Sequence, residues 1–254
     1  MSKMPVLFIG HGSPMNAIEE NRFTKAWAEI AAKIPKPEVI LCISAHWTTD
    51  GSRVSDDPQP KTVYDMYGFP QALYEVKYTP PGAPNLAHMV RDLAPEVQID
   101  NSWGIDHGTW SVLHVMYPEA DIPLIQLSVS LNGDRQYHFE LGQKLKSLRE
   151  KGVLIMGSGN VVHNLGRVNL DMNGGYDWAI EFDDYIKNNI ASREFKNVID
   201  YKKAGKSALE AFYTTEHFDP LLYVLGASDE KDSLRIFNNE CALGSLSMTG
   251  YLFG

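Results

Sequence analysis

The sequence has few cysteines and lacks any long apolar run. Cys42 and Cys241 are the two cysteines among its 254 residues, too few for the disulfide framework of a small secreted domain. No stretch approaches the roughly 18 consecutive apolar residues that a membrane helix needs, and the first residues do not form a signal peptide. These features lead us to expect a cytoplasmic protein without a membrane partner.

The chain also has fewer basic than acidic residues. The chain has 23 Lys and Arg residues against 32 Asp and Glu residues, and its formal net charge at pH 7 is -9. Nucleic acids and anionic membrane surfaces attract clustered Lys and Arg, so we expect no nucleic-acid partner. The hydrophobic fraction of 44% is ample for a core. Because no Pro/Ser-rich linker divides the chain, residues 1–254 are expected to form a single domain.

Several common catalytic signatures are missing. The chain has no HExxH, the helical motif of many zinc proteases. Ser13 and Ser158 do not lie in the GxSxG context of a hydrolase nucleophile. The segment GSGN at 157–160 is too short for a dinucleotide fingerprint, because Val162 replaces the third glycine and no phosphate-binding lysine follows. A serine hydrolase and a dinucleotide enzyme are therefore disfavoured.

The chain does contain short apolar runs that are each followed by a polar break and a histidine. They are residues 5–9 before His11, 39–44 before His46 and 153–156 before His163. Their composition is typical of buried parallel strands, and ligands of open α/β sheets bind beyond the carboxyl ends of such strands. His217 differs, because it precedes Asp219 and Pro220, which are typical of a helix start.

The remaining elements alternate in the manner of an α/β domain. Strand-like runs lie at 124–129, 234–237 and 245–253, and helical patterns lie at 15–34, 85–93, 110–116, 135–150, 176–190 and 206–212. Thr109 is expected to cap the helix at 110–116, which leaves His107 in a loop. His138 is expected to be solvated on the outer face of its helix.

Four histidines without thiolate neighbours indicate a catalytic rather than a structural metal site. Neutral imidazole suits zinc, iron, copper and nickel, whereas structural zinc sites typically use cysteine. We therefore expect His11, His46, His163 and His217 to surround one metal with open positions. Three hypotheses remain from the residues alone: a zinc hydrolase with an activated water, a non-haem iron(II) oxygenase, and a non-catalytic protein that binds a metal or an aromatic molecule.

Eight motifs, in this order and spacing, carry a resemblance over nearly the whole chain. They are GHGSPMNAIEEN, ISAHW, YGFPQALY, WGIDHGTW, YPEADIPLIQLS, GSGNVVHNL, HFDPLLYVLGA and GSLSM. Together they closely resemble the DOPA-type extradiol ring-cleavage dioxygenases, of the class III extradiol superfamily. The resemblance implies an α/β fold with a central mixed, mostly parallel sheet flanked by helices on both faces. It also implies that a catechol, such as L-DOPA or a related diol, is opened with O2 to a muconic semialdehyde.

The resemblance also assigns roles to residues. His11, His46 and His217 match metal ligands, His163 matches an acid/base that becomes a fourth ligand in a zinc-loaded site, and His107 resembles a second active-site histidine. The polar residues expected to contact substrate are Ser13, Asp65, Asp106 and Asn160. Fe2+ is the expected catalytic metal, and Zn2+ is compatible with the purified protein because imidazole sites bind it well. In the protocatechuate branch a glutamate is the third ligand, so Glu216 is the alternative to His217.

Overall fold

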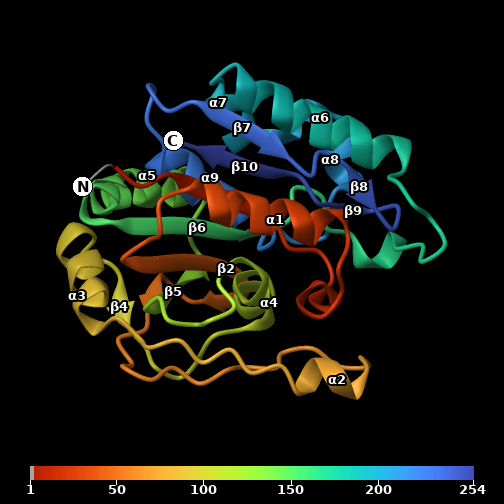
Figure 1. Cartoon of the computed structure of the whole chain (residues 1–254). Helices are drawn as coiled ribbons and strands as arrows, with labels where there is room; N and C mark the ends of the chain where they lie inside the picture. The colour runs from red at the N-terminus through yellow and green to blue at the C-terminus, as the bar shows by residue number, and fades with distance from the viewer. Residues whose placement is uncertain (1–2) are drawn as a thin grey trace.

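A mixed sheet of eight strands forms the centre of the computed structural model, which describes residues 3–254 (Figure 1). The strand order is β4-β3-β5-β2-β6-β1-β10-β7, and β8 and β9 form a separate pair. The strands are β1 (Val6–Gly10), β2 (Val39–Thr49), β3 (Arg53–Val54), β4 (Gln98–Ile99), β5 (Leu124–Ser130), β6 (Val153–Gly159), β7 (Leu234–Phe237), β8 (Cys241–Ala242), β9 (Leu246–Ser247) and β10 (Gly250–Phe253).

The four central strands β5, β2, β6 and β1 run parallel. At one edge β10 pairs antiparallel with β1 and with β7, and at the other β3 pairs antiparallel with β5. Every residue of β1, β5 and β6 is buried, because helices cover both faces of the sheet. A strand buried on both faces has no polar side to alternate with its apolar side. This explains why the runs in the sequence are continuously apolar.

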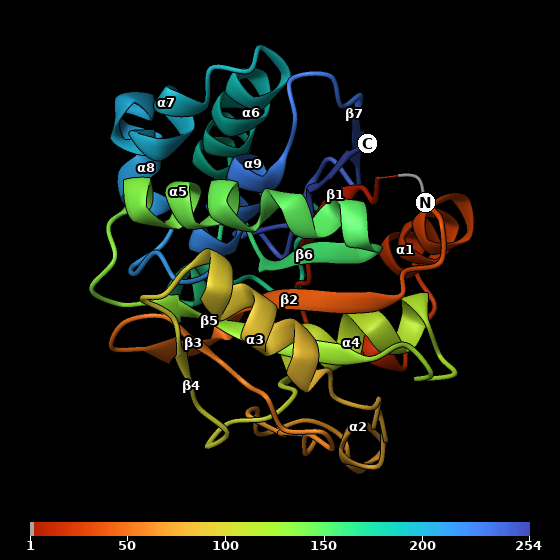
Figure 2. The ribbon, with the colours of Figure 1, turned by 90° about the vertical axis from the view of Figure 1, so that its left-hand side faces the viewer.

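The helices form two layers with separate apolar cores. They are α1 (Arg22–Lys33), α2 (Gln71–Tyr74), α3 (Pro84–Leu93), α4 (His107–Met116), α5 (Arg135–Leu145), α6 (Asp177–Ala191), α7 (Phe195–Ile199), α8 (Lys206–Glu210) and α9 (Asp219–Ala227), with 3-10 turns at Pro14–Ala17, Lys146–Lys151, Leu165–Arg167 and Tyr201–Ala204. One core joins α3, α5, α6 and α9 to the sheet, and α3 and α5 lie nearest the viewer in Figure 2. The other core includes Trp27 of α1 and Trp110 of α4, both fully buried.

Three expected elements are interrupted, and one of them, the helix predicted at 135–150, is α5 followed by the 3-10 turn Lys146–Lys151. The helix predicted at 15–34 is a 3-10 turn followed by α1, because Asn21 caps α1 by accepting hydrogen bonds from the backbone N–H groups of Phe23 and Thr24. The strand predicted at 245–253 is divided into β9 and β10. Conversely, β2 continues beyond the predicted run to Thr49, with a register shift between Ser44 and Thr48 that places His46 inside the strand.

The prediction of a solvated His138 was wrong. Its side chain is 1% exposed and stacks on Tyr223 of α9, with ring centroids 5.1 Å apart. Its Nε2 lies 3.1 Å from the carbonyl oxygen of Ser130. The error arose because α5 packs closely along α9, so more of its circumference is buried than the charge pattern indicated.

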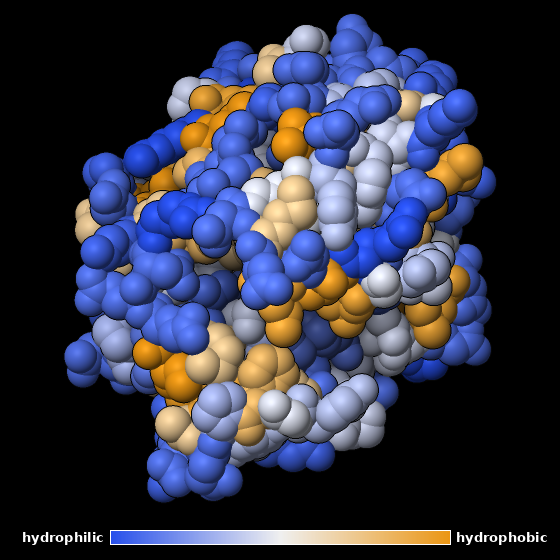
Figure 3. Space-filling model, turned by 90° about the vertical axis from the view of Figure 1, so that its right-hand side faces the viewer, coloured by the Kyte–Doolittle hydropathy of each residue, from blue (hydrophilic) through white to orange (hydrophobic). Residues whose placement is uncertain are grey.

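The surface shows scattered rather than continuous apolar character. The most exposed large apolar side chains are Tyr67, Leu131, Leu165, Leu170, Leu209 and Tyr213. On the face shown in Figure 3, hydrophobic residues form small groups separated by hydrophilic ones. No helix within residues 3–254 combines the length and the apolar character that crossing a membrane requires.

Candidate metal centre and active site

Five histidines from distant parts of the chain meet beyond the carboxyl ends of the parallel strands. His11 follows β1, His46 lies in β2, His107 begins α4, His163 follows β6, and His217 precedes α9. The ring centroids of His46 lie 5.1 Å from His11, 3.9 Å from His107 and 4.9 Å from His217. The His163 and His217 rings are stacked, with centroids 3.5 Å apart and an angle of 5° between their planes. The edge of the sheet thus gathers the histidines that the sequence pattern predicted.

Three of these rings offer nitrogen atoms to one common space. The ligand atoms of His11, His46 and His217 all lie within 4.8 Å of one another. The Nε2 atoms of His11 and His46 are 3.3 Å apart. The Nε2 atom of His217 is buried and has no hydrogen-bond partner among residues 3–254. Such an orphaned buried nitrogen is costly unless another group satisfies it.

The hydrogen bonds of His11 decide which of its nitrogens carries the proton. Ser158 Oγ lies 2.5 Å from the carbonyl oxygen of Gly108, which can only accept, so the hydroxyl donates there. The Ser158 oxygen is then free to accept from His11 Nδ1, which lies 3.0 Å away. His11 therefore carries its proton on Nδ1 and turns the lone pair of Nε2 toward the common space.

Two carboxylates impose the same arrangement on the other two rings. His46 Nδ1 lies 3.2 Å from Asp65 Oδ2, and His217 Nδ1 lies 3.1 Å from Glu216 Oε1. A carboxylate accepts and does not donate, so the hydrogen bond with Glu216 and the 3.2 Å ion-pair contact with Asp65 both favour a proton on Nδ1 and leave an Nε2 lone pair. Histidine ligands of metals are oriented by outer carboxylates in this way. Three lone pairs that converge without a proton between them fit a bound cation.

Neutral imidazoles are the form that ligates a metal, and the environment favours it. Burial and the neighbouring histidines lower the pKa of His11 and of His217 well below the ordinary value. Burial opposes ionisation of Asp65. The hydrogen bonds and charges of His107 and His46 outweigh that effect and hold the Asp65 pKa far below its usual range. The site therefore combines uncharged His11 and His217 rings with an ionised Asp65 carboxylate.

Two further groups could hold a metal, but they share residues with the first. His46, Asp65 and His107 form one, and His163, Glu216 and His217 form the other. In both, the carboxylate faces a histidine Nδ1 that carries the proton. The group of His11, His46 and His217 is therefore the one whose free lone pairs face one another. Glu216 supports His217 from behind and is not a member of that group.

His163 stands beside the three-histidine group. Its backbone N–H donates to the carbonyl oxygen of Ala211, which ties it to the segment before His217. Burial and repulsion from His46, partly opposed by Glu216, lower its pKa to about 4. The ring is thus neutral at pH 7, which is the form that accepts a proton.

His107 is the first residue of α4 rather than a loop residue. Asp106 caps the helix, and its Oδ1 accepts from the backbone N–H of Thr109 at 3.2 Å. The expectation that Thr109 is the cap was therefore wrong by three positions. The Thr109 side chain instead contacts Cys42, with Thr109 Oγ1 and Cys42 Sγ 3.2 Å apart.

Asp106 lies beneath the site and not in its wall. Its carboxylate is fully buried and accepts from Ser44 Oγ at 2.6 Å, Gln126 Nε2 at 2.7 Å and Trp103 Nε1 at 3.1 Å, besides the helix N–H. Donors from the chain occupy both oxygens. Asp106 therefore holds the start of α4, and with it His107, and its expected contact with substrate stays a prediction.

Ser13 and Asn160 also bond to the chain. Ser13 Oγ accepts from the backbone N–H of Met15 at 3.2 Å and shapes the turn after His11. Asn160 is fully buried, and its Nδ2 donates to the carbonyl oxygen of Ser247 at 2.8 Å. Its Oδ1 has no hydrogen-bond partner among residues 3–254. Both residues hold segments that carry active-site histidines.

Sequence reasoning missed the supporting roles of Ser158 and Glu216. Ser158 was considered only as a nucleophile, and Glu216 only as an alternative ligand. Their contacts with His11 and His217 depend on how β6 and the segment before α9 approach one another, which no local pattern expresses. The proximity of Glu216 to His217 in sequence was the one available signal.

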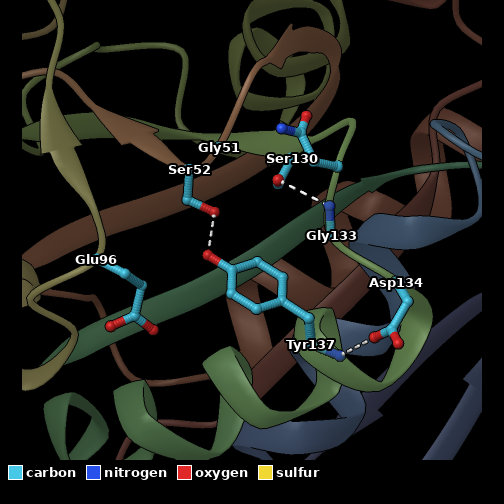
Figure 4. A pocket seen from close by; sticks show the side chains of 8 residues that line it. Gly51, Ser52, Glu96, Ser130, Gly133, Asp134 and Tyr137 are labelled. Carbon is cyan, nitrogen blue, oxygen red and sulfur yellow. Dashed lines mark hydrogen bonds between the residues drawn. The ribbon is translucent and has the colours of Figure 1, made fainter.

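A separate hollow of about 420 Å3 lies near the ends of β2 and β5 (Figure 4). Tyr137 and Ser52 point toward each other across it, with their oxygens 2.9 Å apart. The backbone N–H of Gly133 donates to Ser130 Oγ at 3.1 Å. Glu96, also in its lining, pairs with Lys144 at 2.6 Å. Because these polar groups already bond within the chain, the histidine cluster remains the candidate site.

The chain belongs to the aromatic ring-opening dioxygenases, since the family model described as the catalytic LigB subunit of aromatic ring-opening dioxygenase matches residues 4–253. It is 43% identical over 263 residues to the 4,5-DOPA dioxygenase extradiol of Escherichia coli (strain K12), covering 100% of this chain and 96% of that protein. It is 38% identical over 256 residues to the 4,5-DOPA dioxygenase extradiol of Beta vulgaris, covering 97% and 95%.

A solved structure shares the fold. The crystal structure of an uncharacterized Escherichia coli K12 protein superposes with a TM-score of 0.86 at 40% sequence identity, covering 99% of this chain and 100% of that one. The resemblance read from the motifs is thereby confirmed. So is the predicted α/β fold with a mixed, mostly parallel sheet between helices.

Proposed function

We propose that this protein is a metal-dependent extradiol dioxygenase that opens the ring of a catechol with O2 to give a muconic semialdehyde. Both oxygen atoms enter the product, so the reaction requires no external reductant. The relatives at 43% and 38% identity bear the name 4,5-DOPA dioxygenase extradiol. L-DOPA or a related diol is therefore the proposed substrate.

One observation carries the proposal: ligand nitrogens of His11, His46 and His217 lie within 4.8 Å of one another, while Ser158, Asp65 and Glu216 contact their Nδ1 atoms. Three imidazoles without thiolate leave open positions on a bound ion. His11, His46 and His217 would hold iron(II), which would supply the redox chemistry that lets a catechol react with dioxygen. Zinc fits the same nitrogens, so the purified protein is expected to accept it as well.

The remaining histidines supply proton transfer. His163 is neutral at pH 7, with a pKa of about 4, and lies stacked on His217 at 3.5 Å. It is placed to take the proton of a catechol hydroxyl and so increase the electron density of the ring. His107 lies beside His46, with ring centroids 3.9 Å apart, and its Nδ1 lies 3.0 Å from Asp65 Oδ1. In this proposal it gives or holds a proton near the reacting oxygens.

The test is oxygen uptake by the full chain. The protein is freed of metal, loaded anaerobically with ferrous iron, mixed with L-DOPA or another catechol, and then exposed to O2. We expect consumption of one O2 for each catechol opened and a new visible absorption band from the semialdehyde. The His46→Ala variant serves as the control without a complete ligand set. Absence of uptake with every member of a broad catechol panel would overturn the proposal, and turnover of an ester panel by the zinc form without O2 would indicate a hydrolase.

A further inference from the structure

Asp65 touches two active-site histidines with its two oxygens. Its Oδ2 lies 3.2 Å from His46 Nδ1. Its Oδ1 accepts the backbone N–H of His107 at 3.0 Å and also lies 3.0 Å from the Nδ1 of that ring. The Asp65 side chain is only 11% exposed. Both oxygens therefore contact the chain, and the substrate contact expected from the sequence stays a prediction.

We infer that Asp65 is a positioning residue that sets the tautomer of His46 and, with the same carboxylate, places His107 beside it. This inference rests on the proposed function, because it assumes that His46 ligates a metal through Nε2. A carboxylate accepts at both oxygens, so its 3.2 Å contact favours a proton on His46 Nδ1 and frees Nε2. The two rings are then held with centroids 3.9 Å apart, one as a metal ligand and one as a proton carrier.

The contacts predict what an isosteric amide would do at this position. The backbone N–H of His107 always donates, so an asparagine at 65 must turn its carbonyl oxygen toward His107. Its NH2 group then faces His46 Nδ1. Two donors cannot share that contact, so His46 must move its proton to Nε2, the nitrogen that faces His11 at 3.3 Å. With a proton on Nε2, His46 cannot bind a metal through that nitrogen.

Glu216 provides a matched contrast on the other side of the site. Its Oε1 lies 3.1 Å from His217 Nδ1, but no backbone donor among residues 3–254 fixes its second oxygen in the way that His107 fixes Oδ1 of Asp65. A glutamine at 216 can therefore rotate its carbonyl oxygen toward His217. Asp65→Asn and Glu216→Gln each remove one negative charge, but only Asp65→Asn moves the proton of the neighbouring histidine to Nε2.

The experiment measures tautomers and metal affinity separately. In the metal-free protein, long-range 1H–15N NMR identifies the protonated nitrogen of each ring, and zinc affinity is measured by competition with a chromogenic chelator. We expect Nδ1–H for His46 in the native protein and in Glu216→Gln, and Nε2–H in Asp65→Asn. Loss of an outer partner typically weakens metal binding by about 10–100-fold, and we expect that loss for Asp65→Asn and a smaller one for Glu216→Gln.

Each outcome separates the inference from the function. Suppose that the native protein binds zinc, that His46→Ala does not, and that Asp65→Asn keeps both the native affinity and the proton on His46 Nδ1. The positioning role of Asp65 is then wrong, while the metal site stands. Equal losses in Asp65→Asn and Glu216→Gln would attribute the effect to charge and also overturn it. Failure of the native protein to bind metal would overturn the proposed function itself. If Asp65→Asn does not fold, Asp65→Ala takes its place. Alanine presents no donor to His46, so we expect a mixture of the two His46 tautomers and weaker zinc binding than in the native protein.

Discussion

Gly159, the last residue of β6, is predicted to control the position of His217. A Cβ atom built at Gly159 would lie 2.0 Å from the carbonyl oxygen of His217, and the next backbone N–H, that of Asn160, donates to the same oxygen at 2.8 Å. Real Cβ contacts essentially never fall under 3.0 Å. In Gly159→Ala, β6 and the segment carrying His217 must therefore separate by about 1 Å, the difference between these distances.

The expected loss follows from that displacement. A misplacement of about 1 Å in an active site can lower activity by about 100-fold, which corresponds to about 2.7 kcal/mol of transition-state stabilisation. Overpacking of a dense core also lowers the free energy of unfolding by about 1–3 kcal/mol. We expect Gly159→Ala to show both effects, together with weaker zinc binding, because the displaced group carries a proposed ligand.

Gly226→Ala is the matched control. Its Cβ would also lie 2.0 Å from a backbone carbonyl oxygen, that of Phe139, but at the opposite end of α9 from His217. Urea unfolding gives the stability of each variant, and oxygen uptake with a catechol gives kcat/KM under conditions where both are folded. Native kcat/KM in Gly159→Ala would refute the reasoning. Equal losses of kcat/KM in both variants would show that α9 stability, and not the placement of His217, is responsible.

Three other predictions concern the metal and the buried charges. His11→Ala should lose the metal in a chelator competition, whereas His163→Ala should keep it and lose turnover; loss of metal from both would make His163 a ligand. Zinc at about 100 times its Kd should raise the free energy of unfolding of the native protein by about 2.7 kcal/mol, and His11→Ala should show no such rise. Asp232→Asn should lower the free energy of unfolding at pH 7 by roughly 3–5 kcal/mol, because it leaves the fully buried Arg149 guanidinium, 2.7 Å from Oδ2, without its counter-ion. Burial opposes ionisation of Asp232, but hydrogen bonds from Arg149 and Lys3 lower its folded pKa. The stability that it contributes is therefore present above the ordinary carboxyl pKa and is lost as pH falls through the lowered value. Urea unfolding across this acidic range checks this, and an equally steep acid loss in Asp232→Asn would contradict it.

The sequence predicted the parallel strands and the histidines at their ends for a local reason. A strand buried on both faces must be apolar along its length, so β1 and β6 stand out as runs, and a histidine after each run falls at the same edge of the sheet. The interruption before α1 was missed because the capping bonds of Asn21 override an uninterrupted helical pattern. His138 was misplaced because its burial comes from α9, far away in the chain.

The sequence by itself thus determined the α/β class, the family and the histidines that gather at the site, because these depend on residue types and their order along the chain. Only the tertiary structure decided which nitrogen of each ring faces the common space, that Asp65 joins His46 to His107, and that Asp106 lies beneath the site. These features depend on contacts between residues up to 147 positions apart, such as His11 with Ser158. The direction of a hydrogen bond across such a contact is set by packing, which no local pattern records.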